Sequence, residues 1–314
     1  MTTGFVYDDR FLSHDTGPGH PERPARMTAV MSTLGKLPWY GSLERLEAQA
    51  ADVELIEAVH SLTYIKRAAQ ACETGAPFLD TTDVTISEKS CDVAYLAAGA
   101  PLVLADAVVA GTIDNGFALL RPPGHHAERE GAMGFCLFNN VAILARFLQK
   151  RHGFDKIAIV DFDVHHGNGT QHSFEADPSV LYVSTHQYPY YPGTGAASET
   201  GVGRGKGATL NCPMPAGATD ADYERAFVEQ IIPKLEGFAP KFVIVSAGFD
   251  AHGDDPLADV RLTTECFGWM SDRLMEVADR HAGGRLLSVL EGGYHLERLS
   301  ECVTVHLESL NQAV

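Results

Sequence analysis

The chain has 314 residues, of which 45% are hydrophobic, so it is long enough to bury a large core. It carries 24 Lys and Arg residues against 41 Asp and Glu residues, which gives a formal net charge of −17. This acidic balance argues against a nucleic-acid partner held by phosphate contacts.

The first third of the chain predicts helices that are separated by polar loops. Residues 5–7 form a short predicted strand, and helices are expected over 25–34, within 53–71 and over 89–109. The Pro- and Gly-rich segment 14–24 is either a plain surface loop or the rim of a substrate entrance. The segment 75–87 is a second such loop.

From residue 115 onward, apolar strands alternate with polar loops and helices. Strands are expected at 117–120, 157–160, 180–184, 242–247 and 286–290. Helices are expected at 141–150 and from a capping box at 219–222 to about residue 235. Fully apolar strands of this kind predict an α/β fold with one parallel sheet covered on both faces. No linker divides the sequence, so we expect a single domain over residues 1–314.

The cysteines and the apolar stretches predict a soluble, cytoplasmic protein without a membrane partner. The six cysteines show no C-x-x-C spacing, which indicates neither a disulfide framework nor a thiolate zinc site. The first residues lack the basic region and apolar run of a secretory signal. The longest uncharged apolar stretch, 93–105, is shorter than the roughly 20 residues that a bilayer requires. The Gly-rich run 201–207 is no phosphate loop, because Gly207 stands where Ser or Thr is needed.

The stretch 157–169 ends an apolar strand in two aspartates and two histidines. If the strand geometry persists, Asp161, Asp163 and His165 project to the same side. A lone Asp-x-His is usually turn chemistry. So many ionisable groups at one strand end are costly to desolvate unless a metal or mutual pairing compensates them. The stretch therefore predicts metal binding or catalysis.

Polar side chains also end three other predicted strands, namely His125 with His126, Asp250, and Tyr294. In a parallel sheet these ends lie on one edge. Asp163, His165 and Asp250 form a ligand set that leaves positions open for water and substrate. Zinc is the first expectation, and iron(II) fits the same set.

The remaining residues of this group supply acid–base chemistry. His125 and His126 are bases that are not needed as ligands, and Asp161 is placed to fix the tautomer of one of them. Tyr294 follows two glycines that permit a tight turn, and its phenol can donate a hydrogen bond to an oxyanion. Together these groups predict metal-assisted hydrolysis of an amide or ester.

These motifs resemble those of the zinc-dependent histone deacetylase family, in the family's order and over nearly the whole chain. The matching segments are 19–24, 121–127, 134–136, 161–170, 192–195, 247–252 and 291–294. The resemblance implies the three-layer arginase–deacetylase fold with a central, mainly parallel sheet. The segment 121–126 and Asn168, where class I enzymes carry Asp, are more similar to class II enzymes and bacterial deacetylase-like amidohydrolases, including acetylpolyamine amidohydrolases.

The resemblance also implies an activity, the removal of acetyl or other short acyl groups from lysine side chains by metal-activated water. It places Zn²⁺ on Asp163, His165 and Asp250. His126 is then the general base and later the general acid, with Asn168 behind it. His125 is an electrostatic helper held by Asp161. Tyr294 polarises the substrate carbonyl and holds the oxyanion; class IIa members carry His there, so Tyr294 predicts a competent deacetylase.

Further residues match the family's substrate tunnel and its potassium site. Phe135 and Tyr191 match the aromatic pair that flanks the acyl-lysine tunnel beside Gly134, although the family usually has Phe at the second position. Asp83, or Asp80 with a different gap placement, matches the aspartate that grips substrate backbone amides. The family binds K⁺ through backbone oxygens near Asp161, Asp163, His165, Ser184 and Thr185, a segment that this chain keeps.

Three alternatives stay open at this point. The substrate could be an acetylated polyamine instead of acyl-lysine, and the rim loops 15–24, 79–86 and 196–207 would decide between them. A non-catalytic acyl-lysine reader would bind a hydroxamate without releasing acetate. A ureohydrolase of the same fold would hold two manganese ions. His166 has no ligand role in any of these readings and is expected to be structural. The sequence predicts no oligomeric state.

Overall fold

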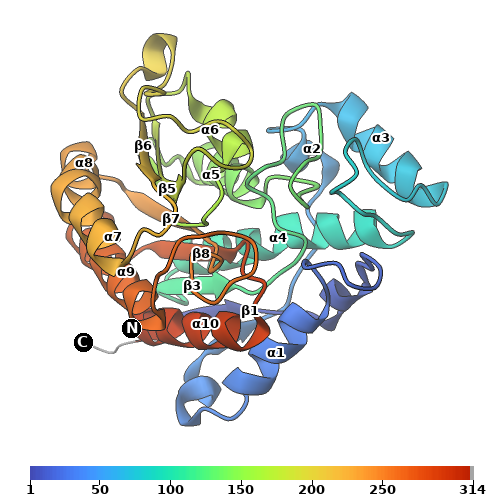
Figure 1. The fold of residues 1–314 in the computed structure, drawn as a ribbon, viewed down its shortest axis with the longest axis horizontal. Helices are drawn as coiled ribbons and strands as arrows, with labels where there is room; N and C mark the ends of the chain where they lie inside the picture. Colours follow the sequence, from blue (N-terminus) through green and yellow to red (C-terminus); the bar gives the residue numbers. More distant parts are fainter. Residues whose placement is uncertain (312–314) are drawn as a thin grey trace.

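The computed structural model describes residues 1–311 and contains one eight-stranded sheet, in the order β2-β1-β3-β8-β7-β4-β5-β6 (Figure 1). The strands are β1 (Thr3–Val6), β2 (Glu44–Leu46), β3 (Asn115–Ala118), β4 (Ile157–Asp161), β5 (Val180–Gln187), β6 (Thr209–Met214), β7 (Phe242–Ala247) and β8 (Leu286–Leu290). Every neighbouring pair is parallel. The predicted parallel α/β fold is therefore confirmed.

Helices cover the sheet on both faces and complete three layers. They are α1 (Ala25–Leu34), α2 (Val53–Ile56), α3 (Leu62–Glu73), α4 (Ser90–Val109), α5 (Asn140–His152), α6 (Asn168–Phe174), α7 (Asp220–Ala226), α8 (Ile232–Phe238), α9 (Thr264–Val277) and α10 (Leu296–Asn311). Short 3-10 segments lie at Asp9–Ser13, Pro38–Ser42 and Gly203–Gly205, and π-helical turns at Phe227–Ile231 and Ala278–Ala282. The predicted capping box joins Thr219 to Asp222 at the start of α7.

The core is divided between the two faces because successive strand residues point in opposite directions. In β4, Ile157 and Ile159 pack with residues of α4 and α5, whereas Ala158 and Val160 pack with residues of α1, α9 and α10. Figure 1 shows α1 beside α10 in this second layer. Burial on both sides explains why β4 and its neighbours are apolar along their whole length.

We expect no membrane span because the apolar stretch 93–105 is short, but helix α4, which contains this stretch, is longer. By length and composition its 20 residues could cross a bilayer, so the argument from length does not hold for this segment. Its burial gives a better account, because 72% of its most apolar window lies inside the protein. Burial of this kind is typical of a core helix that packs on a sheet.

The sequence does not predict two of the strands, β2 and β6, and the reasons differ. The short β2 is mostly exposed and shows no apolar alternation. Strand β6 contains Asn211 and Pro213 and lies at the edge of the sheet, where a proline is tolerated. The strand expected at 117–120 begins two residues earlier, at Asn115.

The order of the central strands places the candidate catalytic and metal-binding residues close together. Strands β3, β8, β7 and β4 are consecutive neighbours in the sheet. The loops that follow them carry, in the same order, the two histidines 125–126, Tyr294, Asp250, and Asp163 with His165. Since all four strands run in the same direction, these four loops meet at one edge.

Candidate active site

Three side chains with metal-binding atoms meet beyond the ends of β4 and β7. Nδ1 of His165 lies 3.2 Å from Asp163 Oδ1 and 3.1 Å from Asp250 Oδ2. Two ligand atoms that each lie about 2 Å from a shared tetrahedral cation are separated by roughly this distance. All three residues are buried, and their atoms form one compact group of possible ligands. The donor set therefore fits a divalent cation.

Asp163 and His165 do not meet by strand alternation, and that sequence-based expectation is wrong. Strand β4 ends at Asp161, and both ligands lie in the turn that follows. The N–H of Asp163 donates to Asp161 Oδ1 at 3.2 Å, and the N–H of His165 donates to Asp163 Oδ1 at 2.9 Å. A hydrogen-bonded turn therefore orients the two side chains.

Backbone N–H groups hold both ligand carboxylates in place. Gly292 donates to Asp163 Oδ2 at 2.8 Å, and Val164 donates to Asp250 Oδ1 at 2.8 Å. A Cβ atom on Gly292 would lie 2.3 Å from Asp250 Oδ2, so only glycine allows the backbone to come this close. These contacts fix the outer oxygens of the ligands, as is typical of metal sites.

The charge of this group also favours a cation. Burial, and then the nearby Asp163 carboxylate, raise the pKa of Asp250 to about 7, because two buried carboxylates this close resist being charged together. A divalent cation would compensate both charges.

A second group of possible ligands, His125, Cys136 and Glu291, is less suited to a metal. Burial raises the pKa of the Cys136 thiol well above its usual value, and its Sγ donates to the carbonyl oxygen of Gly134. The thiolate is the form that binds metals. Both oxygens of Glu291 already accept hydrogen bonds, from Gly124, His125 and Ser246.

His126 is held as a neutral base. Its Nδ1 lies 2.8 Å from Asn168 Oδ1, and the amide nitrogen of Asn168 donates to Glu128 Oε1 at 2.5 Å. Because that amide is fixed in this direction, Nδ1 of His126 carries the proton and Nε2 keeps a free lone pair. Burial, and then the nearby His125, lower the pKa of His126 well below its usual value. Asn168 therefore supports His126, as the family resemblance implies.

His125 has the opposite charge preference. Its Nδ1 lies 3.0 Å from Asp161 Oδ2, which also accepts a hydrogen bond from the Tyr182 hydroxyl at 3.1 Å. Burial by itself would lower the pKa of His125, but the carboxylates of Asp163 and Asp161 outweigh it and raise the pKa to about 10. The pKa values of the two adjacent histidines are thus shifted in opposite directions.

Tyr294 faces this group from the loop after β8. Burial raises the pKa of its phenol well above its usual value, so the hydroxyl stays a hydrogen-bond donor. Its ring packs edge-on against Phe135 at 5.8 Å and lies under the guanidinium of Arg26 at 5.0 Å. Arg26 also donates to the carbonyl oxygens of Gly293 and Glu291, at 2.7 and 2.5 Å.

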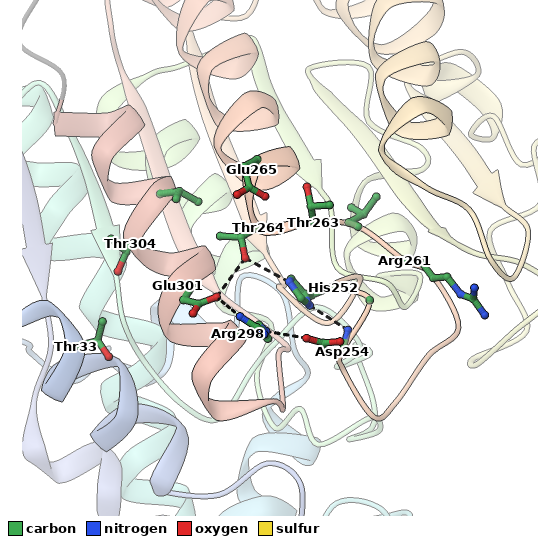
Figure 2. A pocket seen from close by; sticks show the side chains of 13 residues that line it. Thr33, His252, Asp254, Arg261, Thr263, Thr264, Glu265, Arg298, Glu301 and Thr304 are labelled. Carbon is green, nitrogen blue, oxygen red and sulfur yellow. Dashed lines mark hydrogen bonds and ion pairs between the residues drawn. The ribbon is translucent and has the colours of Figure 1, made fainter.

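A narrow cavity of about 250 Å³ joins these residues to the surface. It is lined by Asp83, His126, Gly134, Phe135, His165, Tyr190, Tyr191, Leu257 and Tyr294. Its lining is mainly aromatic and aliphatic, with catalytic candidates at the base. A wider hollow of about 780 Å³ lies elsewhere, beside α9 and α10, and holds none of these candidates (Figure 2).

Asp83 lines the cavity, whereas Asp80 does not. Asp83 Oδ2 accepts hydrogen bonds from the backbone N–H of Gly134 at 3.0 Å and from the Tyr191 hydroxyl at 3.1 Å. Asp80 instead pairs with Arg67 and accepts from Ala132 N, so it belongs to the support of the loop. The geometry favours Asp83 as the substrate-facing residue.

Of the three predicted rim loops, 79–86 supplies Asp83 to the cavity. Loop 15–24 approaches it through His20, whose ring lies 4.8 Å from that of Phe135. Among the described residues, loop 196–207 contributes nothing to the lining; Val202 N donates to the carbonyl oxygen of Glu175, so this loop packs beside α6. Its expected place at the rim is wrong.

His166 lies outside the ligand group. Its two ring nitrogens lie 2.7 Å from Thr194 Oγ1 and 3.0 Å from Gln171 Oε1. It thereby ties the start of α6 to the loop that follows Tyr191, in keeping with a structural role.

Sequence reasoning missed a buried ionic group under the site. Glu22 Oε2 lies 2.7 Å from Arg121 Nη2, and Glu22 Oε1 lies 3.3 Å from Arg26 Nη1. All three side chains are fully buried. Glu22 and Arg121 lie in matched motifs, but Arg26 has no such signal, since a polar residue in an amphipathic helix usually faces solvent.

Replacing Glu22 with glutamine should destabilise the protein by about 3 kcal/mol at pH 7, because two buried guanidinium groups lose their counter-charge. Burial alone would raise the pKa of Glu22, but the Arg121 guanidinium outweighs it and lowers the pKa to about 2. The stabilising effect should therefore be complete above the unfolded pKa near 4.5 and vanish as the pH falls towards 2. Urea unfolding at a series of pH values measures this difference.

The exposed Glu88 offers the matched control for that series. Glu88→Gln should leave stability within about 0.5 kcal/mol of the wild type. If the difference in the free energy of unfolding between Glu22→Gln and wild type stayed constant down to pH 2, the ionic explanation would be contradicted.

Comparison with known proteins gives one consistent result. The sequence matches the family of the histone deacetylase domain over residues 20–310. It is 43% identical to "Histone deacetylase 10, chloroplastic" of Oryza sativa subsp. japonica, over 90% of this chain and 68% of that protein. It is 41% identical to "Polyamine deacetylase HDAC10" of Homo sapiens, over 99% of this chain but 48% of that protein.

A solved structure is similar over the same extent. The crystal structure of the HDA15 HD domain superimposes with a TM-score of 0.92 at 38% sequence identity. The match covers 98% of this chain and 89% of that domain. The similarity therefore includes both helical layers and the sheet edge that carries the site.

Proposed function

Because this chain belongs to the histone deacetylase family and acts as a deacetylase of acylated lysine or acetylated polyamines, we propose that it works with a single zinc ion. Asp163, His165 and Asp250 would hold the ion. The observation that carries this proposal is the convergence of their three ligand atoms at the base of an apolar cavity. Iron(II) would fit the same donors.

When bound, the ion would polarise the scissile carbonyl and lower the pKa of a water molecule. Nε2 of His126 accepts a proton from the attacking water, because Nδ1 is committed to Asn168. His125 lies beside it, held by Asp161, and would stabilise the negative charge that develops on the substrate. The Tyr294 hydroxyl donates a hydrogen bond to the carbonyl oxygen as it becomes an oxyanion.

The same histidine completes the reaction. His126 returns the proton to the amine nitrogen as the C–N bond breaks, so the amine leaves in neutral form and the acyl group leaves as a carboxylic acid. The acid then passes its proton to the amine, which gives the carboxylate and the ammonium ion as products. The Asn168 contact keeps the imidazole in one orientation through both transfers.

The cavity favours an acylated lysine side chain as substrate. Phe135, Tyr191 and Leu257 provide an apolar channel for a hydrocarbon stem, and Asp83 stands at its mouth. Since Asp83 Oδ2 takes both internal hydrogen bonds, Oδ1 is left for an N–H donor of the substrate. An acetylated polyamine is the second candidate, because one relative is named as a polyamine deacetylase and the same carboxylate could pair with an amine.

One panel of substrates tests the proposal. Protein stripped of metal by a chelator and reloaded with Zn²⁺ or Fe²⁺ should release acetate from acetyl-lysine peptides, from acetylated polyamines, or from both. The ratio of kcat/KM values on the two classes then identifies the preferred substrate. The metal-free protein is the control and should be inactive.

Two results would favour the competing functions. Tight binding of a hydroxamate without release of acetate from any member of the panel would indicate an acyl-lysine reader. Two manganese ions per chain in the active protein, with urea released from a guanidino substrate, would indicate a ureohydrolase.

Replacing Tyr191 with phenylalanine should raise KM for acetyl-lysine peptides about 2- to 10-fold and leave kcat nearly unchanged. The change removes the hydroxyl that orients Asp83, and one such hydrogen bond contributes about 0.5–1.5 kcal/mol. Steady-state kinetics on a peptide substrate measure the effect. Tyr188→Phe is the control, because Tyr188 does not line the cavity. An unchanged KM would contradict the role of Tyr191.

We also propose a K⁺ ion near the backbone oxygens of Asp161, Asp163, His165 and Ser184. Support comes from Thr185, whose buried Oγ1 has no hydrogen-bond partner among the described residues. Replacing K⁺ by a tetraalkylammonium ion should lower the melting temperature. A reducing, cytoplasmic environment is proposed as well, since all six cysteines are buried and unpaired.

A further inference from the structure

Asp255 lies directly beneath the backbone that carries Tyr294. Its Oδ2 accepts hydrogen bonds from the N–H of Tyr294 at 2.7 Å and from the N–H of His295 at 3.1 Å. Its Oδ1 accepts from the N–H of Leu257 at 3.0 Å. The residue is 7% exposed, so these contacts are shielded from water.

The contacts of Asp255 favour the carboxylate form, because the three backbone hydrogen bonds lower its pKa and so oppose the effect of burial. All three partners are backbone donors, and an ionised carboxylate offers only acceptors. Tyr294 and His295 immediately precede α10, where a negative charge is also favoured by the helix dipole. An asparagine would keep one acceptor oxygen and turn an NH₂ group towards an N–H donor.

Through these contacts, Asp255 joins two walls of the cavity. Leu257 lines the channel, and its carbonyl oxygen accepts a hydrogen bond from the Tyr190 hydroxyl at 2.8 Å. Tyr190 in turn stacks on the ring of His165. The backbone of Tyr294 and the channel wall therefore share one anchor.

The neighbouring Asp254 makes exposed contacts on the outer side of the same loop, where Figure 2 labels it beside Arg298 and Glu301. Arg298 on α10 donates to Asp254 Oδ2 at 2.8 Å and to Glu301 Oε2 at 2.7 Å. The N–H of Asp254 donates to His252 Nδ1 at 3.0 Å. The side chain of Asp254 is 53% exposed, so the two adjacent aspartates point to opposite sides of the loop.

We infer that Asp255 is a positioning residue, which fixes the Tyr294 backbone and so places the phenol hydroxyl over the ligand group. This inference rests on the proposed function, in which Tyr294 donates to the oxyanion. Asp255 is distinct from the ligands and the histidines, since within residues 1–311 its side-chain oxygens accept hydrogen bonds only from backbone N–H groups.

A double-mutant cycle with the zinc-loaded enzyme tests the inference. Asp255→Asn should lower kcat about tenfold while zinc content stays at one per chain. In the Tyr294→Phe background the same change should lower kcat less than twofold, because the hydroxyl to be positioned is already absent. Asp254→Asn is the matched control and should leave kcat within twofold of wild type.

The outcomes separate this inference from the proposed function. Equal losses in the two backgrounds would show a general structural effect and overturn the role of Asp255 alone. A Tyr294→Phe enzyme with normal turnover would overturn the proposed function, and with it the need for positioning. If Asp255→Asn does not fold, Asp255→Glu keeps both acceptor oxygens one methylene further away and is measured in the same cycle.

Discussion

Replacing Asp250 with alanine should release the metal and reduce deacetylation by more than about 10³-fold. The reason is that a bound metal ion contributes several kcal/mol of transition-state stabilisation, and about 1.4 kcal/mol corresponds to a tenfold change in rate. Within the described part of the chain, removing this ligand also leaves His165 Nδ1 with Asp163 as its one hydrogen-bond partner. Metal analysis after gel filtration and the rate of acetate release measure the two effects together.

The control for this variant lies four residues further along the chain. Asp254→Ala removes an exposed carboxylate and should keep both metal and turnover. An Asp250→Ala protein that retained one zinc per chain with full affinity would contradict the assignment of the ligands. Loss of Asp250 should not unfold the chain, because the neighbouring strands are held by their own apolar contacts.

Tyr294→Phe should lower kcat by about 10²–10³ and leave metal content unchanged. The substitution removes only the hydroxyl, while the ring keeps its contacts with Phe135 and the Arg26 guanidinium. Since the lost hydrogen bond is stronger in the transition state than in the bound substrate, kcat should fall more than KM changes. Single-turnover kinetics at saturating substrate provide the measurement.

Two results bear on the alternatives to this role. Near-normal turnover would mean that another group holds the oxyanion. Loss of metal together with activity would mean that Tyr294 acts by holding the metal ligands. The structure argues against this, because Asp163 is held by the backbone N–H of Gly292 and not by the Tyr294 hydroxyl.

The parallel sheet and the residues of the site could be predicted because their signals are local. Strands β4 and β7 are continuous apolar runs that end in charged residues, and that contrast is visible in the sequence. The rule that parallel strands end on one edge then brings Asp163, Asp250 and Tyr294 together without any knowledge of the coordinates.

Other features depend on contacts that no local signal reveals. Asp254 and Asp255 are identical neighbours, yet one is exposed and the other anchors Tyr294. The sequence predicts that Arg26 of α1 faces solvent, but the residue is fully buried. The turn that gathers Asp163 and His165 replaces the strand geometry expected there, since hydrogen bonds to Asp161 end the strand.

The strand order has a consequence for how the chain is made. Strand β8 lies between β3 and β7, so the last strand in the sequence joins one half of the sheet, β2-β1-β3, to the other, β7-β4-β5-β6. Because residues 286–290 follow every other strand in the sequence, the facing edges of β3 and β7 have no partner strand until β8 has been made. The active site therefore closes only after β8 has been made, and a chain that stops short of β8 lacks the joint between its two halves as well as Tyr294.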